Sequence, residues 1–208
     1  MYEKKNVIFR HIKHNVTLYT FSFILFLTGI IFGALTVNNM SFIQKQDLYF
    51  YLEQFFEQLH KEPIISRKDI LIQSTFYHAK YLTLFFILGL TIIGLPLIWL
   101  LLFIKGLLVG FSVGFLVNQL GTKGLLYATF AIAPQNMIII PLYIIAATLA
   151  MLFSLSLLQK IMGKTVRNSF KQQIVQYTML FFILFGLAFI SSLVETYVAN
   201  EAFKILLQ

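Results

Sequence analysis

Long apolar runs dominate the pattern of positions along this chain. One run extends from Val16 to Val37 and another from Ile174 to Val194, while a much longer one from Tyr81 to Leu158 is interrupted only by Lys105, Lys123 and a few amides and prolines. A helix needs about 20 apolar residues to cross the roughly 30 Å of hydrocarbon in a bilayer. The pattern therefore predicts an all-α, polytopic membrane helix bundle that forms a single integral membrane domain.

Composition agrees with this class. Hydrophobic residues make up 59% of the chain and charged residues only 12%, against about 25% charged in soluble domains. The first apolar run follows a basic segment, as in a signal peptide, but it is longer than a typical cleaved apolar region, so we expect an uncleaved anchor. The chain has no cysteine, which excludes a disulfide framework and thiol chemistry.

The basic residues predict the orientation. They are dense before the first run and in residues 159–173, whereas basic and acidic residues balance in residues 38–80. The two dense segments should share the cytoplasmic side, which explains the net charge of +8 without nucleic acid as a partner. The chain must then cross the membrane an odd number of times between them, and three crossings fit. We expect a cytoplasmic N-terminus, an extracytoplasmic C-terminus, a tight cytoplasmic turn at Lys105, and five spans at 16–37, 81–104, 106–121, 133–158 and 174–194.

Glycines recur at a spacing of four within two of the apolar runs. Glycine costs roughly 1 kcal/mol relative to alanine inside a helix in water. In lipid, however, small residues at this spacing let two helix backbones approach closely. The glycines are therefore candidates for packing within the bundle or for contact with a span of another protein: Gly29, Gly33, Gly106, Gly110 and Gly114.

Prolines and amides interrupt the long central run. An unbroken helix from Leu125 to Leu158 would be about 50 Å long, which exceeds the bilayer even with tilt. We expect a short re-entrant or interfacial piece up to Ala133, a break at Pro134, and an N-cap at Asn136 for a helix starting at Met137. The break is a structural helix start with a kink at Pro141, part of the polar cavity of a transporter or channel, or a contact with a partner protein. The candidate polar positions are Asn118, Gln119, Pro134, Gln135, Asn136 and Glu195, with Glu195 expected at the outer interface.

Residues 38–80 form the largest segment outside the predicted spans. Ser41 and Gln44 match a capping box, and the apolar residues that follow recur at helical spacing, which predicts an amphipathic helix ending before Pro63. A second box at Ser66 and Asp69 predicts a helix that continues into the second span. The first helix either covers the membrane or its own bundle, or it docks an extracytoplasmic partner. Its candidate contact residues are Tyr49, Tyr51, Leu52, Phe55 and Phe56.

No catalytic or metal-binding motif stands out. Glu53 and Glu57 lie four apart on a solvated helix face, and the four histidines match no metal pattern such as HExxH. Phosphate-binding loops and nucleophile elbows are absent from the sequence as well. We therefore expect a protein that is not an enzyme and that binds no cofactor or metal ion.

Several stretches together resemble a known family. In this order and spacing, "LFLTGIIFGALTVN", "QKQDLYFYLEQFF", "IIGLPLIWLLLFIKGLLVGFSVGFLVNQLGTKG", "APQN" and "ISSLVETYV" look like the stage II sporulation protein M family of spore-forming Firmicutes, nearly end to end. The resemblance implies a multi-pass protein of the mother-cell membrane, placed at the sporulation septum and the engulfing membrane. It brings no catalytic residues with it.

The same resemblance implies a function and partners. It suggests a membrane anchor and scaffold that recruits two peptidoglycan-degrading proteins, stage II sporulation proteins D and P, for septal wall thinning and forespore engulfment. Those partners would supply the chemistry that the chain itself lacks. A membrane transporter or channel with a polar site at Gln135 and Asn136 is the alternative, and homo-oligomerisation stays open.

Overall fold

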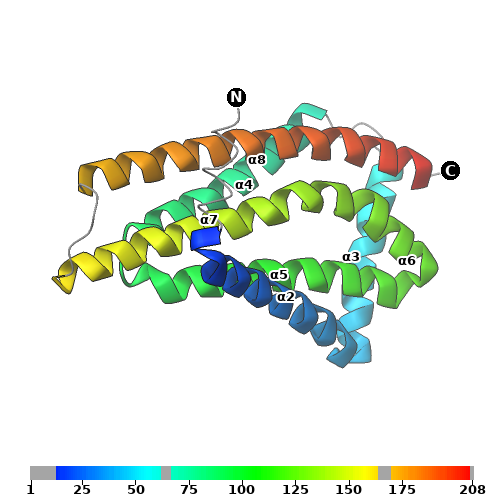
Figure 1. The fold of residues 1–208 in the computed structure, drawn as a ribbon. Coiled ribbons are helices and arrows are strands. Elements are labelled where there is room, and N and C mark those ends of the chain that lie inside the picture. The colour runs from blue at the N-terminus through cyan, green and yellow to red at the C-terminus, as the bar shows by residue number, and fades with distance from the viewer. Residues whose placement is uncertain (1–12, 62–66, 164–169, 207–208) are drawn as a thin grey trace.

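Helices make up every element that the structure describes (Figure 1). The structure is a computed structural model that describes residues 13–61, 67–163 and 170–206. Within these residues, α2, α5, α7 and α8 are long and apolar enough to cross a membrane. The all-α class is thereby confirmed, and a multi-pass membrane protein is supported. The elements are α2 (Val16–Asn39), α3 (Phe42–Lys61), α4 (Arg67–Gly89), α5 (Gly94–Leu120), α6 (Thr122–Tyr127), a π-helix (Ala128–Ile132), α7 (Ala133–Ile161) and α8 (Phe170–Leu206).

The central helix of the bundle is α7. It contacts α4 and α8 on one side and α2 and α5 on the other (Figure 1). Small side chains let these neighbours come close, because Ala146, Ala147 and Ala150 of α7 are fully buried. Ser22 of α2 and Thr148 of α7 add a buried hydrogen bond of 2.9 Å. The core of the protein thus surrounds α7.

The most extensive contact between two helices joins α2 and α5. The predicted glycines lie in this contact, where backbone meets backbone: a Cβ on Gly29 would lie 3.1 Å from Gly106 Cα, and one on Gly114 would lie 3.1 Å from Ala34 Cα. The short distance between the backbones of α2 and α5 leaves no room for a side chain at most of these positions. Residue numbers rise together along the contact, so α2 and α5 run parallel.

The predicted turn at Lys105 is wrong. Helix α5 continues without a break through this position, and Lys105 is only 4% exposed. The chain instead turns between α4 and α5 at residues 90–93, where Thr91 N–H donates to Leu88 O at 3.1 Å. Gly94 is required there because a Cβ would lie 2.6 Å from Leu88 C. The span bounds predicted at 81–104 and 106–121 are therefore wrong: α4 and α5 occupy this part of the chain, and of the two only α5 is a candidate span.

The fourth span predicted at 133–158 matches the start of α7, but the helix start predicted at Met137 is wrong. Helix α7 begins at Ala133 rather than at Met137, because Pro134 occupies the first turn, where the missing N–H needs no acceptor. Asn136 does not cap the helix, and its side chain instead donates to Ile132 O at 2.9 Å. Before α7, the chain reverses at Gly121, whose φ of 57° favours glycine, and continues through α6 and the π-helix.

Helix α3 makes few contacts with the other described helices, and it crosses the end of the bundle where α6 is found (Figure 1). The predicted capping box is confirmed, since Ser41 N–H donates to Gln44 Oε1 at 3.0 Å and Gln44 N–H donates to Ser41 Oγ at 3.3 Å. Tyr49 and Leu52 are half-buried, whereas Tyr51 is 67% exposed. The side chains of Phe55 and Phe56 and the second predicted box at Ser66 lie outside the described residues.

Candidate functional site

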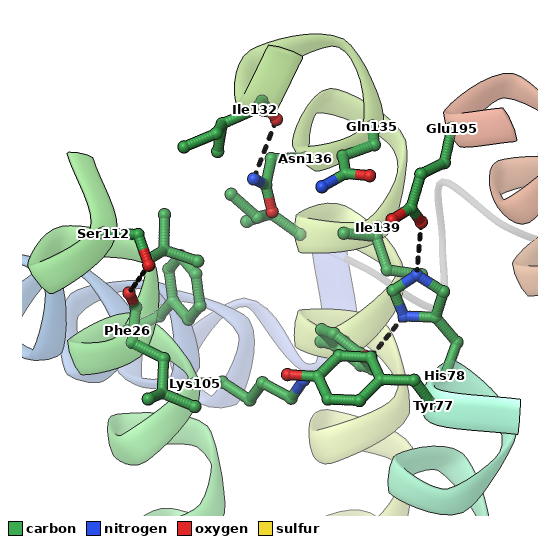
Figure 2. A pocket seen from close by; sticks show the side chains of 14 residues that line it. Phe26, Tyr77, His78, Lys105, Ser112, Ile132, Gln135, Asn136, Ile139 and Glu195 are labelled. Carbon is green, nitrogen blue, oxygen red and sulfur yellow. Dashed lines mark hydrogen bonds and ion pairs between the residues drawn. The ribbon is translucent and has the colours of Figure 1, made fainter. Parts of the chain in front are cut away.

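A cavity of about 220 Å³ lies between the helices of the bundle, and polar side chains from four of them reach it (Figure 2). Helix α4 contributes Tyr77 and His78, and α5 contributes Lys105 and Ser112. Helix α7 contributes Gln135, Asn136 and Tyr143, and α8 contributes Glu195. The further lining residues are apolar: Phe26, Leu108, Val109, Ile132, Ile139 and Ile140.

Glu195 of α8 is held by three side chains from two other helices. Ser74 Oγ of α4 donates to Glu195 Oε2, and His78 Nε2 lies 3.5 Å from the same oxygen. The amide of Gln135 faces both carboxylate oxygens at 2.9 and 3.0 Å, so its nitrogen takes this position and donates to them. The carboxylate therefore ties α4, α7 and α8 together at one point.

His78 extends this network towards the centre of the bundle. Its ring is nearly buried, and Nδ1 shares a hydrogen bond of 2.7 Å with the hydroxyl of Tyr143 on α7. Tyr143 is itself 3% exposed. Figure 2 shows the contact between Glu195 and His78. A polar chain thus runs from Glu195 through His78 to Tyr143 within the bundle.

Lys105 is enclosed by aromatic rings rather than by acids. Its Nζ lies 3.3 Å from the ring centroid of Tyr81, 4.0 Å from that of Tyr77 and 4.7 Å from that of Tyr143. An ammonium group above the face of an aromatic ring is attracted by the ring quadrupole, and the attraction grows when water is excluded. The three rings, from α4 and α7, therefore form a cage that holds the lysine at one end of the cavity.

The structure brings some of the predicted polar positions together and separates others. Gln135, Asn136 and Glu195 all line the cavity. Pro134 lies beside them in the first turn of α7. Asn118 and Gln119 lie near the C-terminal end of α5 and do not line it; there Gln119 Nε2 donates to Asn118 Oδ1 at 3.2 Å.

Sequence reasoning missed the residues that complete the cluster: Ser74, His78, Lys105 and Tyr143. A signal for two of them was present, because Ser74 and His78 are spaced by four and therefore share one face of a helix. A lysine within an apolar run was a second signal, since intramembrane ionisable residues are candidates for function by default. The tyrosines that surround the lysine come from distant parts of the chain, which no local pattern reveals.

The arrangement can bind and orient a polar group, because hydrogen-bonding side chains from four helices line the cavity. Among the residues whose side chains the structure describes, no three His, Asp or Glu side chains gather closely enough to hold a metal ion. The carboxylate and the imidazole are engaged with each other and with neighbouring side chains. The cavity therefore has the character of a binding site within the membrane.

Comparison with known proteins gives one match. A family model described as stage II sporulation protein M matches residues 22–200. No curated protein and no solved structure matches the chain. The matched range contains the glycine contact between α2 and α5 and all the residues that line the cavity.

Proposed function

Because the chain belongs to the stage II sporulation protein M family, we propose that it is a membrane anchor that positions peptidoglycan-degrading proteins during spore formation. Membership makes it a sporulation-related membrane protein. The proposal adds the scaffold role, the partners, stage II sporulation proteins D and P, and a location in the mother-cell membrane at the septum and the engulfing membrane. The family match is the observation that carries it.

The proposed topology has five crossings, with a cytoplasmic N-terminus and an extracytoplasmic C-terminus. Helices α2 and α5 run parallel, so the chain between them must return across the membrane, and α4 is the helix available for this crossing. The basic residues before α2 and around the connection from α7 to α8 then lie on the cytoplasmic side, as the positive-inside rule requires. On this topology α3 is extracytoplasmic.

The proposed partner surface is α3. This helix makes few contacts with the other described helices, and large apolar side chains on it are exposed: Phe42 by 78%, Ile43 by 69%, Phe50 by 56% and Tyr51 by 67%. Exposed apolar surface of this kind, next to polar residues, is typical of a protein or membrane contact site. An extracytoplasmic hydrolase anchored near the membrane would meet this helix first.

In this proposal the chain supplies position and the partner supplies hydrolysis. Most of its own polar cluster is buried within the bundle: His78, Lys105 and Tyr143 are each less than 10% exposed. We therefore propose that the protein is not an enzyme.

Site-specific photocrosslinking in sporulating cells tests the proposal. A probe at Tyr51 on α3 should yield an adduct with a cell-wall hydrolase. A probe at Met162, which is 65% exposed at the opposite end of the bundle, is the matched control and should not. Self-adducts or lipid adducts alone from Tyr51, in cells that still complete engulfment, would contradict the proposed partner surface.

Transport is a second candidate, favoured by one observation. Gln135 and Asn136, the predicted polar site of a transporter or channel, do line a cavity within the membrane. A transporter requires flux of a solute across vesicles that contain the purified protein, and this flux should fall when Glu195 is replaced by Gln. Absence of any flux above that of empty vesicles would argue against this function.

A further inference from the structure

Lys105 is a buried cation without an acidic partner. Its side chain is 4% exposed, and among the described residues it has no hydrogen bond and no carboxylate within 4.0 Å. The nearby Glu195 is already engaged by Ser74, Gln135 and His78. The charge of Lys105 is therefore met only by the faces of three tyrosine rings.

The position of Lys105 makes this charge costly. It lies eleven residues after the start of α5, about 16 Å along the helix, which is roughly halfway across the hydrocarbon. Charged side chains at this depth are expensive and mark ligand or ion pathways by default. Cation–π contacts offset only part of the cost of desolvating an ammonium group. An anion in the adjoining cavity would complete the pairing.

The cavity has room and polar lining for such a group. Its volume of about 220 Å³ corresponds to roughly seven water molecules at about 30 Å³ each, so it can hold a phosphate with several attached atoms. Asn136 uses one amide N–H to bond Ile132 O and keeps a second donor. Ser112 Oγ donates to Leu108 O and can still accept a hydrogen bond.

An apolar groove continues from the cavity. It has a volume of about 440 Å³ and lies between α5 and the segment formed by α6, the π-helix and α7. Cavity and groove share four lining residues, Val109, Ile132, Asn136 and Ile140. The groove is otherwise lined by apolar side chains and Thr129: Val113, Leu125, Ala128, Ala133, Met137 and Pro141.

We propose that the cavity and the groove together bind one anionic phospholipid, with its phosphate facing Lys105 and an acyl chain lying in the groove. The charge of Lys105 selects an anion, and the apolar groove that opens beside it selects a ligand with a long apolar tail. The groove belongs to helices that cross the bilayer, and its rim residues Leu125 and Met137 are 55% and 78% exposed. Lipid is the molecule that such a surface meets. This site does not depend on the scaffold role, so either proposal can fail without the other.

Lipid retention tests the site. The full chain is purified in mild detergent, incubated with phosphatidylglycerol or phosphatidylcholine, and examined by native mass spectrometry. We expect one phosphatidylglycerol molecule to stay bound and phosphatidylcholine to bind at least about tenfold more weakly. Both lipids carry a phosphate, but the choline cation of phosphatidylcholine cancels its net charge and would lie beside Lys105, which offsets a charge-assisted contact worth a factor of this size. Equal retention of both lipids would overturn the proposal.

Three variants locate the binding. Lys105→Met keeps most of the length of the side chain without its charge and should lose at least about tenfold in affinity for phosphatidylglycerol. Lys123→Met on α6 removes an exposed charge and is the matched control, with no change expected. Thr129→Trp, at an exposed position of the groove, should also weaken retention by filling the place of the acyl chain.

The outcomes separate the sources of the anion. If glycerol 3-phosphate displaces the lipid and binds the Thr129→Trp variant as well as the wild type, the ligand is a soluble anion and the lipid proposal is wrong. Unchanged retention by a folded Lys105→Met variant would also overturn it. If the Lys105→Met variant does not fold, the Thr129→Trp variant and the comparison of the two lipids on the wild type still test the proposal.

Discussion

Replacing Gly110 by Ala should destabilise the protein through a backbone contact, although alanine is the better helix former. A Cβ at Gly110 would lie 2.7 Å from both Ile30 C and Ile30 Cα on α2. Carbon atoms are most stable at about 3.5–4.0 Å, so α2 must move away from α5 by about 1 Å. A gap of this size already forfeits about a quarter to a half of the dispersion energy of each neighbouring contact.

Two further glycines provide the scale for this effect. At Gly114 a Cβ would lie 3.1 Å from Ala34 Cα and 3.4 Å from its Cβ, which a small shift relieves, whereas at Gly186 on α8 nothing lies within 4 Å. Overpacking typically costs about 1–3 kcal/mol. We therefore expect Gly110→Ala to lose about 1–3 kcal/mol and Gly114→Ala less than about 1 kcal/mol. Gly186→Ala should be neutral or slightly stabilising.

The measurement is the free energy of unfolding in mixed micelles, obtained by titration with sodium dodecyl sulfate and followed by circular dichroism. The three variants share the same chemical change, so their differences report the surroundings of each glycine. If Gly110→Ala and Gly186→Ala were equally stable, the close parallel contact of α2 and α5 would be refuted.

Three other predictions concern the same architecture. Because the chain has no cysteine, a pair of cysteines can be introduced without interference, A34C with G114C. The pair should form a disulfide under mild oxidation, because the two Cβ positions are 3.4 Å apart, close to the usual 3.5–4.5 Å. A change in gel mobility without reductant reports the disulfide. Glu195→Ala should lower the free energy of unfolding by about 1–3 kcal/mol, measured by the same titration, because the buried partners of the carboxylate lose their acceptor. An impermeant maleimide should label Tyr51→Cys in intact protoplasts but Met162→Cys only after permeabilisation, and the reverse pattern would contradict the proposed topology.

The sequence allowed the apolar helices to be predicted because their signal is local. Hydropathy identifies α2, α7 and α8 within a few residues, apart from the far end of α8. The capping box at Ser41 was equally readable, since both of its hydrogen bonds form within four consecutive residues. The turn between α4 and α5 was placed wrongly, although Pro96 near the start of α5 and the flanking Gly89 and Gly94 offered a local cue.

A lone lysine in an apolar run, here Lys105, predicts a turn when only its own cost in lipid is considered. That cost is partly offset by Tyr77, Tyr81 and Tyr143, which reach the lysine only after α4 and α7 have packed against α5. Glu195 likewise meets its partners only after the helices have packed, because these partners lie on α4 and α7. Polar clusters inside a helix bundle are tertiary features, so a single sequence indicates their members one by one but not their meeting point.

The glycine contact and the cavity share a wall, which joins the packing of the protein to its candidate site. Phe26 of α2 lines the cavity, and its backbone carbonyl lies against Gly106, the residue directly after Lys105. A side chain at Gly106 would push Phe26 away, because a Cβ there would also lie 3.1 Å from the carbonyl carbon. The close approach of α2 therefore closes the cavity beside the lysine. Glycine at this position serves both the helix contact and the geometry around the buried charge.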